Sequence, residues 1–534
     1  MPAESLSLGR IAFEVQQPVA PSAPTRADIV CFVGYVEQRL ESIPVAKRGT
    51  VEALPGSLRR WLDARGWLAG PYARVADATA LLHVPVPVDD WATFDQLFAW
   101  ERRPVVGEGV ASTYLGAAVR SFFAQGGRRC YVVRAGDPIP LGSSRTARTP
   151  LVAPLLGIRG RPPAEPGDRA GWAGIRHLYG LPDVSFVCLP DLPDLLGGDP
   201  RPVSAPPPPP PPLPAFEPCA TRELEEIVFT EIPTPGVTRM AASEYTEWAR
   251  VVNSIARLLA YTLREVQLVA TVPLPAQDEP LEHALPRLLA HEFLNWSLEG
   301  NKDHTGLGSS FVQLVYPWAV TPGAAALPEG VEPPDGILAG IIARGALLQG
   351  AHHSVASSAL EDVSALSPLL TRADLAVDDD SPLAVKVLPD RISTLGRSPR
   401  GLEVLSDTTP ALLEAYRPAA VHRLVSLIVR GVRQMGETLV WEPSGEELWA
   451  DIRRRIEAVL ETLWEMGALN GGSSAEAYEV RCDRSTTTDN DLENGRLIVT
   501  VAFTASAPIE RITLTLAMDE SGQVSVLGSV GAAA

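Results

Sequence analysis

The stretch from residue 443 to residue 516 holds the densest set of local structural signals in the chain. Ser444 and Glu447 have the spacing of a reciprocal capping box, which predicts that a helix begins here. Apolar residues then recur at intervals of three and four, while charged residues fall on the opposite face. Gly467 follows where a left-handed residue commonly ends a helix. The sequence therefore predicts an amphipathic helix whose apolar face packs against another layer, through Trp449, Ile452, Ile456, Val459, Leu460, Leu463 and Trp464.

Strand-like runs follow this helix and complete a candidate α+β unit. Residues 478–482 and 496–503 flank a polar, turn-forming stretch, which is typical of paired strands. Residues 512–516 alternate strictly between apolar and polar side chains, so this run offers one apolar face to a core.

Two blocks of residues carry a resemblance to a known family. The first contains Val440-Trp441-Glu442-Pro443, Leu463-Trp464-Glu465-Met466-Gly467-Ala468-Leu469 and Val480-Arg481-Cys482-Asp483. It resembles the C-terminal domain of contractile tail sheath proteins. The second block, residues 118–134, is similar to the sheath segment in which a helix ends at a glycine pair and enters a strand. Both blocks stand in the order that the family has.

Length and composition limit the classes of protein to consider. The chain has 534 residues, and single hydrophobic cores rarely grow beyond about 250 to 300 residues, so at least two domains are expected. Its 46 basic and 64 acidic residues give a formal net charge of -18, which argues against nucleic acid as a partner. Five scattered cysteines favour buried thiols in a reducing compartment. Without a signal-peptide pattern or a long apolar run, we expect a cytoplasmic protein without membrane insertion.

The region before residue 378 alternates apolar, strand-like runs with helical patterns. Strands are expected at residues 29–34, 130–134, 184–189, 266–272, 311–316 and 337–343, and helices at 113–124 and 243–263. Such alternation predicts an α/β domain with a layered, largely parallel sheet. The resemblance implies a subtilisin-like topology for this domain.

Changes in composition divide the chain into four parts. We predict an N-terminal arm at residues 1–24, an α/β domain at 25–378, a C-terminal α+β domain at 379–508, and a C-terminal arm and tail at 509–534. Pro-rich insertions are expected at about 138–180 and 195–220. The second contains seven consecutive prolines, Pro206 to Pro212, which form a stiff polyproline II segment and are interpreted as an inserted loop rather than a docking ligand. A further amphipathic helix is expected at residues 419–435.

Short strands near both chain ends lack an obvious partner. Apolar side chains alternate at Ile11, Phe13 and Val15, and again at Ile512, Leu514 and Leu516. A lone strand is not stable in water, so each must join a sheet edge. On sequence alone, pairing within the same chain is favoured, because terminal strands commonly complete the sheet of their own domain. The resemblance implies instead that both arms add to sheets of adjacent subunits.

Patterns for catalysis or metal binding are not found in the sequence. There is no GxSxG elbow and no GxxxxGK[ST] loop, and His291-Glu292 lacks the second histidine of an HExxH motif because Asn295 takes its place. We therefore expect no catalytic residue, no cofactor and no metal. Arg453, Arg454 and Arg455 form one notable basic cluster. It is either a solvated helix face balanced by neighbouring glutamates or, as the resemblance suggests, a surface that faces an acidic inner tube.

The resemblance implies a structural role. We expect a non-enzymatic sheath subunit of a phage tail or a phage-tail-like contractile injection system. It would assemble with itself in hexameric rings stacked helically around an inner tube protein, with baseplate and terminator or cap proteins at the ends. Contraction would drive the tube through a target envelope. Two alternatives stay open, namely a hydrolase of subtilisin-like fold and a baseplate or cap protein that shares the sheath C-terminal domain.

Overall fold

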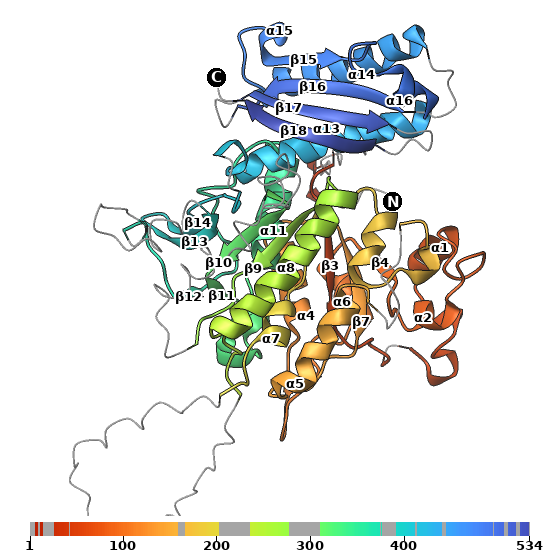
Figure 1. Cartoon of the computed structure of the whole chain (residues 1–534). Helices are drawn as coiled ribbons and strands as arrows, with labels where there is room; N and C mark the ends of the chain where they lie inside the picture. Colours follow the sequence, from red (N-terminus) through yellow and green to blue (C-terminus); the bar gives the residue numbers. More distant parts are fainter. Residues whose placement is uncertain are drawn as a thin grey trace, which may run out of the picture.

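The computed structural model describes residues 6–8, 11–13, 26–41, 43–158, 166–201, 235–276, 310–373, 375, 391–411, 414–439, 445–494, 496–506, 511–518 and 524–532. A large α/β domain carries a smaller α+β domain at one end, and helix α13 lies between them (Figure 1). In the described part of the chain, no helix has both the length and the apolar character needed to cross a membrane.

An eight-stranded sheet forms the centre of the large domain, in the order β14-β13-β10-β9-β8-β3-β7-β4. The six strands from β13 to β7 are all parallel to their neighbours, while β14 and β4 pair antiparallel at the two edges. The predicted layered, largely parallel sheet is thus confirmed. The strands are β3 (Val30–Tyr35), β4 (Pro85–Val88), β7 (Cys130–Gly136), β8 (Phe186–Cys188), β9 (Gln267–Thr271), β10 (Val312–Tyr316), β13 (Ser393–Ser398) and β14 (Gly401–Val404).

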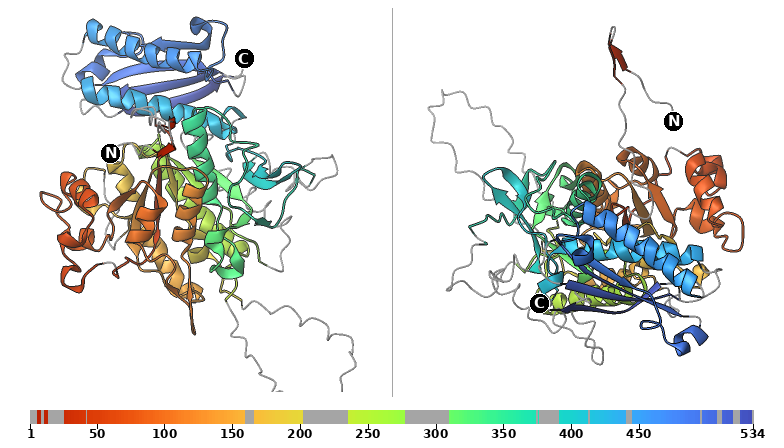
Figure 2. Two further views of the ribbon diagram at one scale, coloured as in Figure 1. Left: turned by 180° about the vertical axis from the view of Figure 1, so that it is seen from behind. Right: turned by 90° about the horizontal axis from the view of Figure 1, so that it is seen from above.

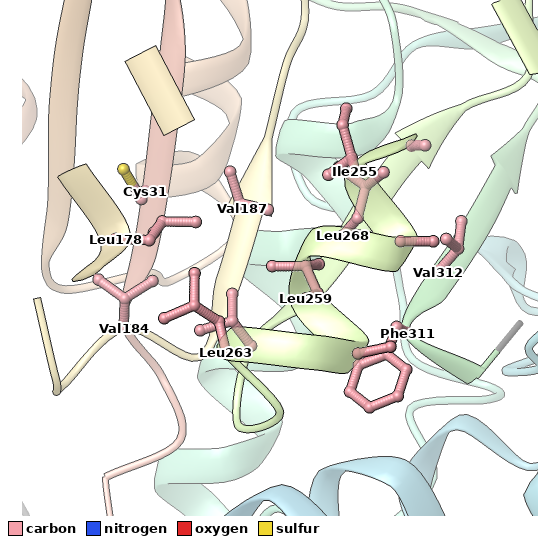
Figure 3. Close-up of a cluster of buried hydrophobic side chains, with 14 of the residues drawn as sticks. Cys31, Leu178, Val184, Val187, Ile255, Leu259, Leu263, Leu268, Phe311 and Val312 are labelled. Carbon is pink, nitrogen blue, oxygen red and sulfur yellow. The ribbon is translucent and has the colours of Figure 1, made fainter. Parts of the chain in front are cut away.

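Helices cover both faces of this sheet, which explains why its inner strands are apolar on both sides. One face packs against α8 (Ala242–Thr262) and the short α7 (Leu192–Leu196). Figure 3 shows Ile255 and Leu259 of α8, and Leu263 directly after it, near Val187 of β8 and Leu268 of β9. The other face packs against further helices, namely α1 (Gly56–Ala64), α3 (Trp91–Leu97), α4 (Tyr114–Ala124) and α11 (Asp335–Leu348).

The prediction of a strand at residues 337–343 is wrong, because this run lies within helix α11. Every residue from Asp335 to Ala343 is buried, so this part of the helix is almost entirely apolar and lacks the polar face that would reveal its period. Gly336 and Gly340 allow α11 to approach α4 closely. A Cβ atom at Gly336 would lie 2.3 Å from the carbonyl oxygen of Ala118, and one at Gly340 would lie 2.6 Å from that of Phe122.

The first Pro-rich segment is part of the core rather than an insertion, which corrects the expectation for residues 138–180. Its described residues form α5 (Arg145–Arg148), α6 (Val152–Leu155) and a 3-10 helix (Gly174–Gly180). Leu155, Ile175 and Leu178 are buried in the same core as α8, so the segment covers the sheet. The seven prolines of the second segment lie outside the described residues.

The C-terminal domain is a four-stranded antiparallel sheet, in the order β15-β16-β17-β18, with two long helices on one face (Figures 1 and 2). The elements are α13 (Ala419–Leu439), α14 (Glu446–Glu465), α15 (Ser474–Ala477), α16 (Asp489–Glu493), β15 (Tyr478–Arg481), β16 (Leu497–Thr504), β17 (Arg511–Met518) and β18 (Val524–Ala532). The predicted helices and the two paired strands are confirmed. Gly467 has a φ of 75°, as expected of a helix end. Gly445 is the N-cap of α14, and Ser444 lies outside the described residues.

Residues 512–516 are not the start of a free arm, which corrects that prediction. They lie in β17, whose two edges pair with β16 and β18 of the same chain. Leu514 and Leu516 are buried under the helices. The strict alternation thus marks an inner strand of a sheet with one covered face, and the C-terminal domain continues to residue 532.

The domain boundary expected at residue 378 also falls too early. Strand β13 pairs parallel with β10 and joins the main sheet, so residues 391–411 belong to the large domain. The change in composition at residues 378–380 therefore does not mark a domain boundary. The two domains meet at α13.

The N-terminal residues form a hairpin of their own. Strand β1 (Leu6–Leu8) pairs antiparallel with β2 (Ile11–Phe13), and within the described chain neither joins another sheet. The right-hand view of Figure 2 shows this hairpin standing away from both domains. Val15, predicted as part of the same strand, lies outside the described residues.

Candidate functional site

The carboxyl ends of the central parallel strands are the place where α/β sheets commonly bind ligands. In this chain a carboxylate of the protein itself occupies that position. Asp191 follows β8, and its Oδ2 accepts a hydrogen bond from the backbone N–H of Tyr35, the last residue of β3, at 2.8 Å. It also accepts from the backbone N–H of Leu115 at the start of α4. A Cβ atom at Gly34 would lie 2.4 Å from Asp191 Oδ2, so glycine makes room for this contact.

Charged partners surround this position and are buried with it. Arg103 pairs with Asp194 at 2.7 Å, and both side chains are almost fully buried. Arg148 donates to the backbone oxygens of Asp194, Gly197 and Gly198. Burial raises the pKa of Asp191 to about 7, against the lowering effect of its hydrogen bonds and of Arg103. The hydrogen bonds of Asp191 therefore tie the segment after β8 to the end of β3 and to the start of α4.

A serine and a histidine meet elsewhere, beneath the C-terminal domain. Nδ1 of His422 on α13 lies 3.2 Å from Oγ of Ser310, and both residues are buried. Burial, followed by the charge of Arg423, lowers the pKa of His422 to about 3. A base this weak and this enclosed cannot take a proton from a serine facing substrate at neutral pH. Within the described ranges, no group of three or more His, Cys, Asp or Glu side chains could hold a metal ion.

Helix α13 is the joint between the domains. Its apolar side chains belong to a hydrophobic cluster that continues from the large domain into the C-terminal sheet. Its polar side carries Arg423, which is 2% exposed and donates to both carboxylate oxygens of Asp407 at 3.2 and 2.7 Å. Asp407 also accepts from Gln313 Nε2 of β10, Ser354 Oγ and the Val355 N–H.

A second arginine on the same side of α13 binds the edge of the large domain. Arg430 donates to Val184 O at 2.7 Å, to Ser185 Oγ at 2.9 Å and to Glu265 O at 3.2 Å. Arg433, one turn further along, pairs with the Glu265 carboxylate. These charged positions were visible in the sequence as polar residues off the apolar stripe, but their buried partners were not.

The predicted basic cluster lies on the exposed side of α14. Arg454 pairs with Asp451 at 3.2 Å and Arg455 with the same carboxylate at 2.7 Å, while Arg453 lies 3.8 Å from Glu457. The three arginine side chains are between 47% and 70% exposed. The intrahelical pairs therefore neutralise part of a surface that stays open to solvent.

Two outer strands of the C-terminal sheet have one open edge each in the described chain. Strand β18 pairs with β17 alone, and β15 with β16 alone. The structure does not bring the predicted arm residues together: Ile11 and Phe13 lie in the separate hairpin, whereas Ile512, Leu514 and Leu516 lie inside the C-terminal sheet. The hairpin, β15 and β18 are therefore among the described segments that have an open edge at which another chain could pair.

Four of the five cysteines are buried free thiols, as predicted: Cys31, Cys130, Cys188 and Cys482. Cys219 lies outside the described residues.

Comparisons with known proteins agree with this architecture. A family model described as the phage tail sheath C-terminal domain matches residues 414–519. A chain from the contracted-state baseplate of the anti-feeding prophage is 16% identical with a TM-score of 0.53, covering 94% of this chain and 96% of that one. A chain from the contracted helical sheath of the anti-feeding prophage is 17% identical with a TM-score of 0.50, covering 94% and 97%.

A third structure extends the similarity to another system. A chain from the contracted PVC sheath complex of an extracellular contractile injection system is 16% identical with a TM-score of 0.50, covering 94% of this chain and 95% of that one. No curated protein matches the sequence. The resemblance to contractile tail sheath proteins is confirmed: the chain carries a phage tail sheath C-terminal domain and has, over nearly its whole length, the fold of chains found in contractile injection system sheaths.

Proposed function

We propose that this protein is the sheath subunit of a contractile injection system or phage tail and that it is not an enzyme. The observation that carries the proposal is the match of the C-terminal domain at residues 414–519 within a chain whose whole fold follows that of sheath chains. Subunits polymerise as hexameric rings stacked helically around an inner tube, between a baseplate and a terminator. The extended lattice is held away from a lower free-energy state, and contraction releases that difference.

Connections between subunits are made by β-strand addition at the open edges. The N-terminal hairpin and β18 or β15 are the segments available for it. Backbone hydrogen bonds of such added strands can persist while side-chain interfaces rearrange, which is what a contracting lattice requires. We also propose that the large domain has the subtilisin-like topology implied by the resemblance; its largely parallel sheet with helices on both faces supports this.

Deleting residues 1–24 tests the strand-addition step. We expect the variant to stay folded, with the thermal unfolding midpoint of the full chain, and to sediment as a monomer, whereas the full chain forms long tubes in electron micrographs. A second variant that ends after residue 518 removes β18 and should also fail to polymerise. Long tubes from the first variant would refute the role of the hairpin. The substitution Leu514→Pro is unsuitable, because Leu514 lies in an inner strand and proline there disrupts the domain itself.

The exposed basic side of α14 is proposed to face the inner tube. Replacing Arg453, Arg454 and Arg455 together with glutamine keeps the helix while removing the charge. Under this proposal the variant still forms sheath, but less tube protein sediments with it than with the wild type. The difference between variant and wild type should be largest at low salt, because the attraction between the arginines and the tube is then strongest. Equal recovery at every salt concentration would assign these residues to solvated surface.

A baseplate or cap role is the second candidate, because structures similar to this chain come from a baseplate as well as from sheaths. Electron microscopy of purified protein separates the two. A sheath subunit gives tubes whose length grows with protein concentration, and a baseplate or cap protein gives rings that stop growing. The hydrolase alternative is not favoured, since the serine–histidine pair of Ser310 and His422 is buried and its histidine is a weak base.

A further inference from the structure

A small cavity lies where α13 meets the large domain. Its volume is about 10 Å³, which is about the room that one water molecule needs. Side chains of β9 and α13 line it, together with the start of β8. Among the lining residues, Gln267, His422 and Arg430 are each at most 2% exposed, and Ser426 is 8% exposed.

Four polar atoms of these lining residues are buried and have no hydrogen-bond partner in the protein. They are Gln267 Oε1, His422 Nε2, Ser426 Oγ and Arg430 Nε. The rest of each long side chain is fixed by other bonds. Gln267 Nε2 donates to Ser310 O at 2.9 Å, and the terminal nitrogens of Arg430 donate to the edge of the large domain. The unpartnered atoms therefore cannot turn toward other partners without breaking these bonds, and leaving them unsatisfied would be costly.

The chemistry of the four atoms identifies what can satisfy them. Arg430 Nε–H can only donate, and Gln267 Oε1 can only accept. Ser426 Oγ can do either. In the tautomer whose Nδ1–H donates to Ser310 Oγ, the Nε2 atom of His422 is an acceptor. Burial lowers the pKa of His422 to about 3, so the ring is neutral and this lone pair is free for hydrogen bonding.

We propose that this cavity is a binding site for a single structural water molecule that joins α13 to strand β9. The water donates its two hydrogens to Gln267 Oε1 and His422 Nε2, and it accepts from Arg430 Nε–H and Ser426 Oγ–H. This complement of two donors and two acceptors disfavours other small occupants. A cation would meet two donors and the charges of Arg423 and Arg430, and an anion would meet two acceptor atoms.

The direct test is a map of the full-length protein, as a crystal or an assembled particle, at better than about 2 Å resolution. We expect one compact density peak at about 2.7–3.2 Å from the four atoms. A map in which Gln267 Oε1 bonds directly to Arg430 Nε, with no peak between them, would overturn the proposal.

An independent test is a double-mutant cycle. If one water bridges Gln267 and Ser426, the effects of substituting these two residues on stability should depend on each other. Ser426→Ala removes one partner of the water and should lower the folding equilibrium constant about tenfold. Gln267→Leu removes another partner together with the bond to Ser310 O, so it should lower the constant further. If both residues bind the same water, the double variant should lose clearly less than the product of the two single effects.

The matched control is Ser254→Ala, because Ser254 lies exposed on α8 and bonds only within its own helix. Combined with Gln267→Leu, it should show no coupling. If the double variant Gln267→Leu/Ser426→Ala changes the folding equilibrium constant by the full product of the two single changes, the two residues do not share a water. This outcome would refute the proposal even if both single variants fold normally.

Discussion

The ion pair between Arg423 and Asp407 allows a quantitative test of the domain joint. Replacing Arg423 with methionine keeps most of the side-chain volume on α13 but leaves the Asp407 carboxylate buried without its counter-charge. Asp407 would retain Gln313, Ser354 and the Val355 N–H as hydrogen-bond donors. Two backbone oxygens, Ala351 O and His353 O, would also lose the donors that Arg423 provides.

Removing one partner of a buried ion pair costs about 3–5 kcal/mol, so we expect Arg423→Met to lower the free energy of unfolding by about 4 kcal/mol. That loss corresponds to about a thousandfold in the folding equilibrium constant. The matched control is Arg455→Met, also on a long helix of the C-terminal domain. Arg455 is 49% exposed in its pair with Asp451, so this variant should lose less than about 1 kcal/mol.

The assay is equilibrium urea unfolding followed by tryptophan fluorescence, at a concentration where the protein is monomeric. Adding Asp407→Asn to Arg423→Met should restore part of the lost stability, because the buried charge is then gone. Equal losses in Arg423→Met and Arg455→Met, or no recovery in the double variant, would refute the reasoning.

The pH dependence of the same variant gives a second readout. Burial alone would raise the pKa of Asp407, but the charge of Arg423 and the hydrogen bonds to Asp407 hold it below its usual value. In the wild type this carboxylate therefore stabilises the fold above its ordinary pKa and loses that effect only in stronger acid. In Arg423→Met only the remaining hydrogen bonds oppose the effect of burial, so the pKa of Asp407 rises and the folded state takes up a proton at higher pH than in the wild type. The stability difference between the two proteins should shrink as the pH falls from 7 to 5.

Three further outcomes can be measured by thermal or chemical unfolding. Gly336→Ala should destabilise the protein by about 3 kcal/mol, because the new Cβ atom would meet the Ala118 carbonyl. The control Gly431→Ala, on α13, has open space for its Cβ atom and should stabilise the protein by about 0.5–1 kcal/mol. A Gly336→Ala variant as stable as the wild type would contradict the close packing of α4 and α11. Burial raises the pKa of Glu332 to about 7, so the folded state keeps a proton that the unfolded chain loses near pH 4.5. The contribution of Glu332 to the free energy of unfolding should therefore fall by about 3 kcal/mol as the pH rises from 4.5 to 7. Glu332→Gln should remove that part of the slope, and an unchanged profile would show that Glu332 is ionised in the fold.

Local patterns predicted most of the regular elements. The inner strands β3, β7, β8, β9 and β10 were found because a strand covered on both faces is a short, continuous apolar run. Helices α8, α13 and α14 were found because each has a polar side that shows its period. The same reasoning explains the wrong prediction at α11, because its residues 335–343 are all buried and this apolar run shows no helical period.

The joint between the domains could not be read from the sequence. Asp407 and Arg423 are close together along the chain, but Gln313 and Ser354, which donate to Asp407, come from distant segments that only the fold brings near. Residues 512–516 illustrate a related limit. Alternation identifies a strand with one covered face, but it carries no information on which edges are occupied.

The double role of α13 has a consequence for engineering chimaeric particles. One side of this helix completes the core of the C-terminal domain, and the other holds arginines matched to acceptors in the large domain. When the C-terminal domain is exchanged between related proteins, an exchange boundary on either side of the helix therefore separates α13 from side chains that it packs against or binds. The transplanted helix must keep the donor's apolar residues and take the recipient's polar ones.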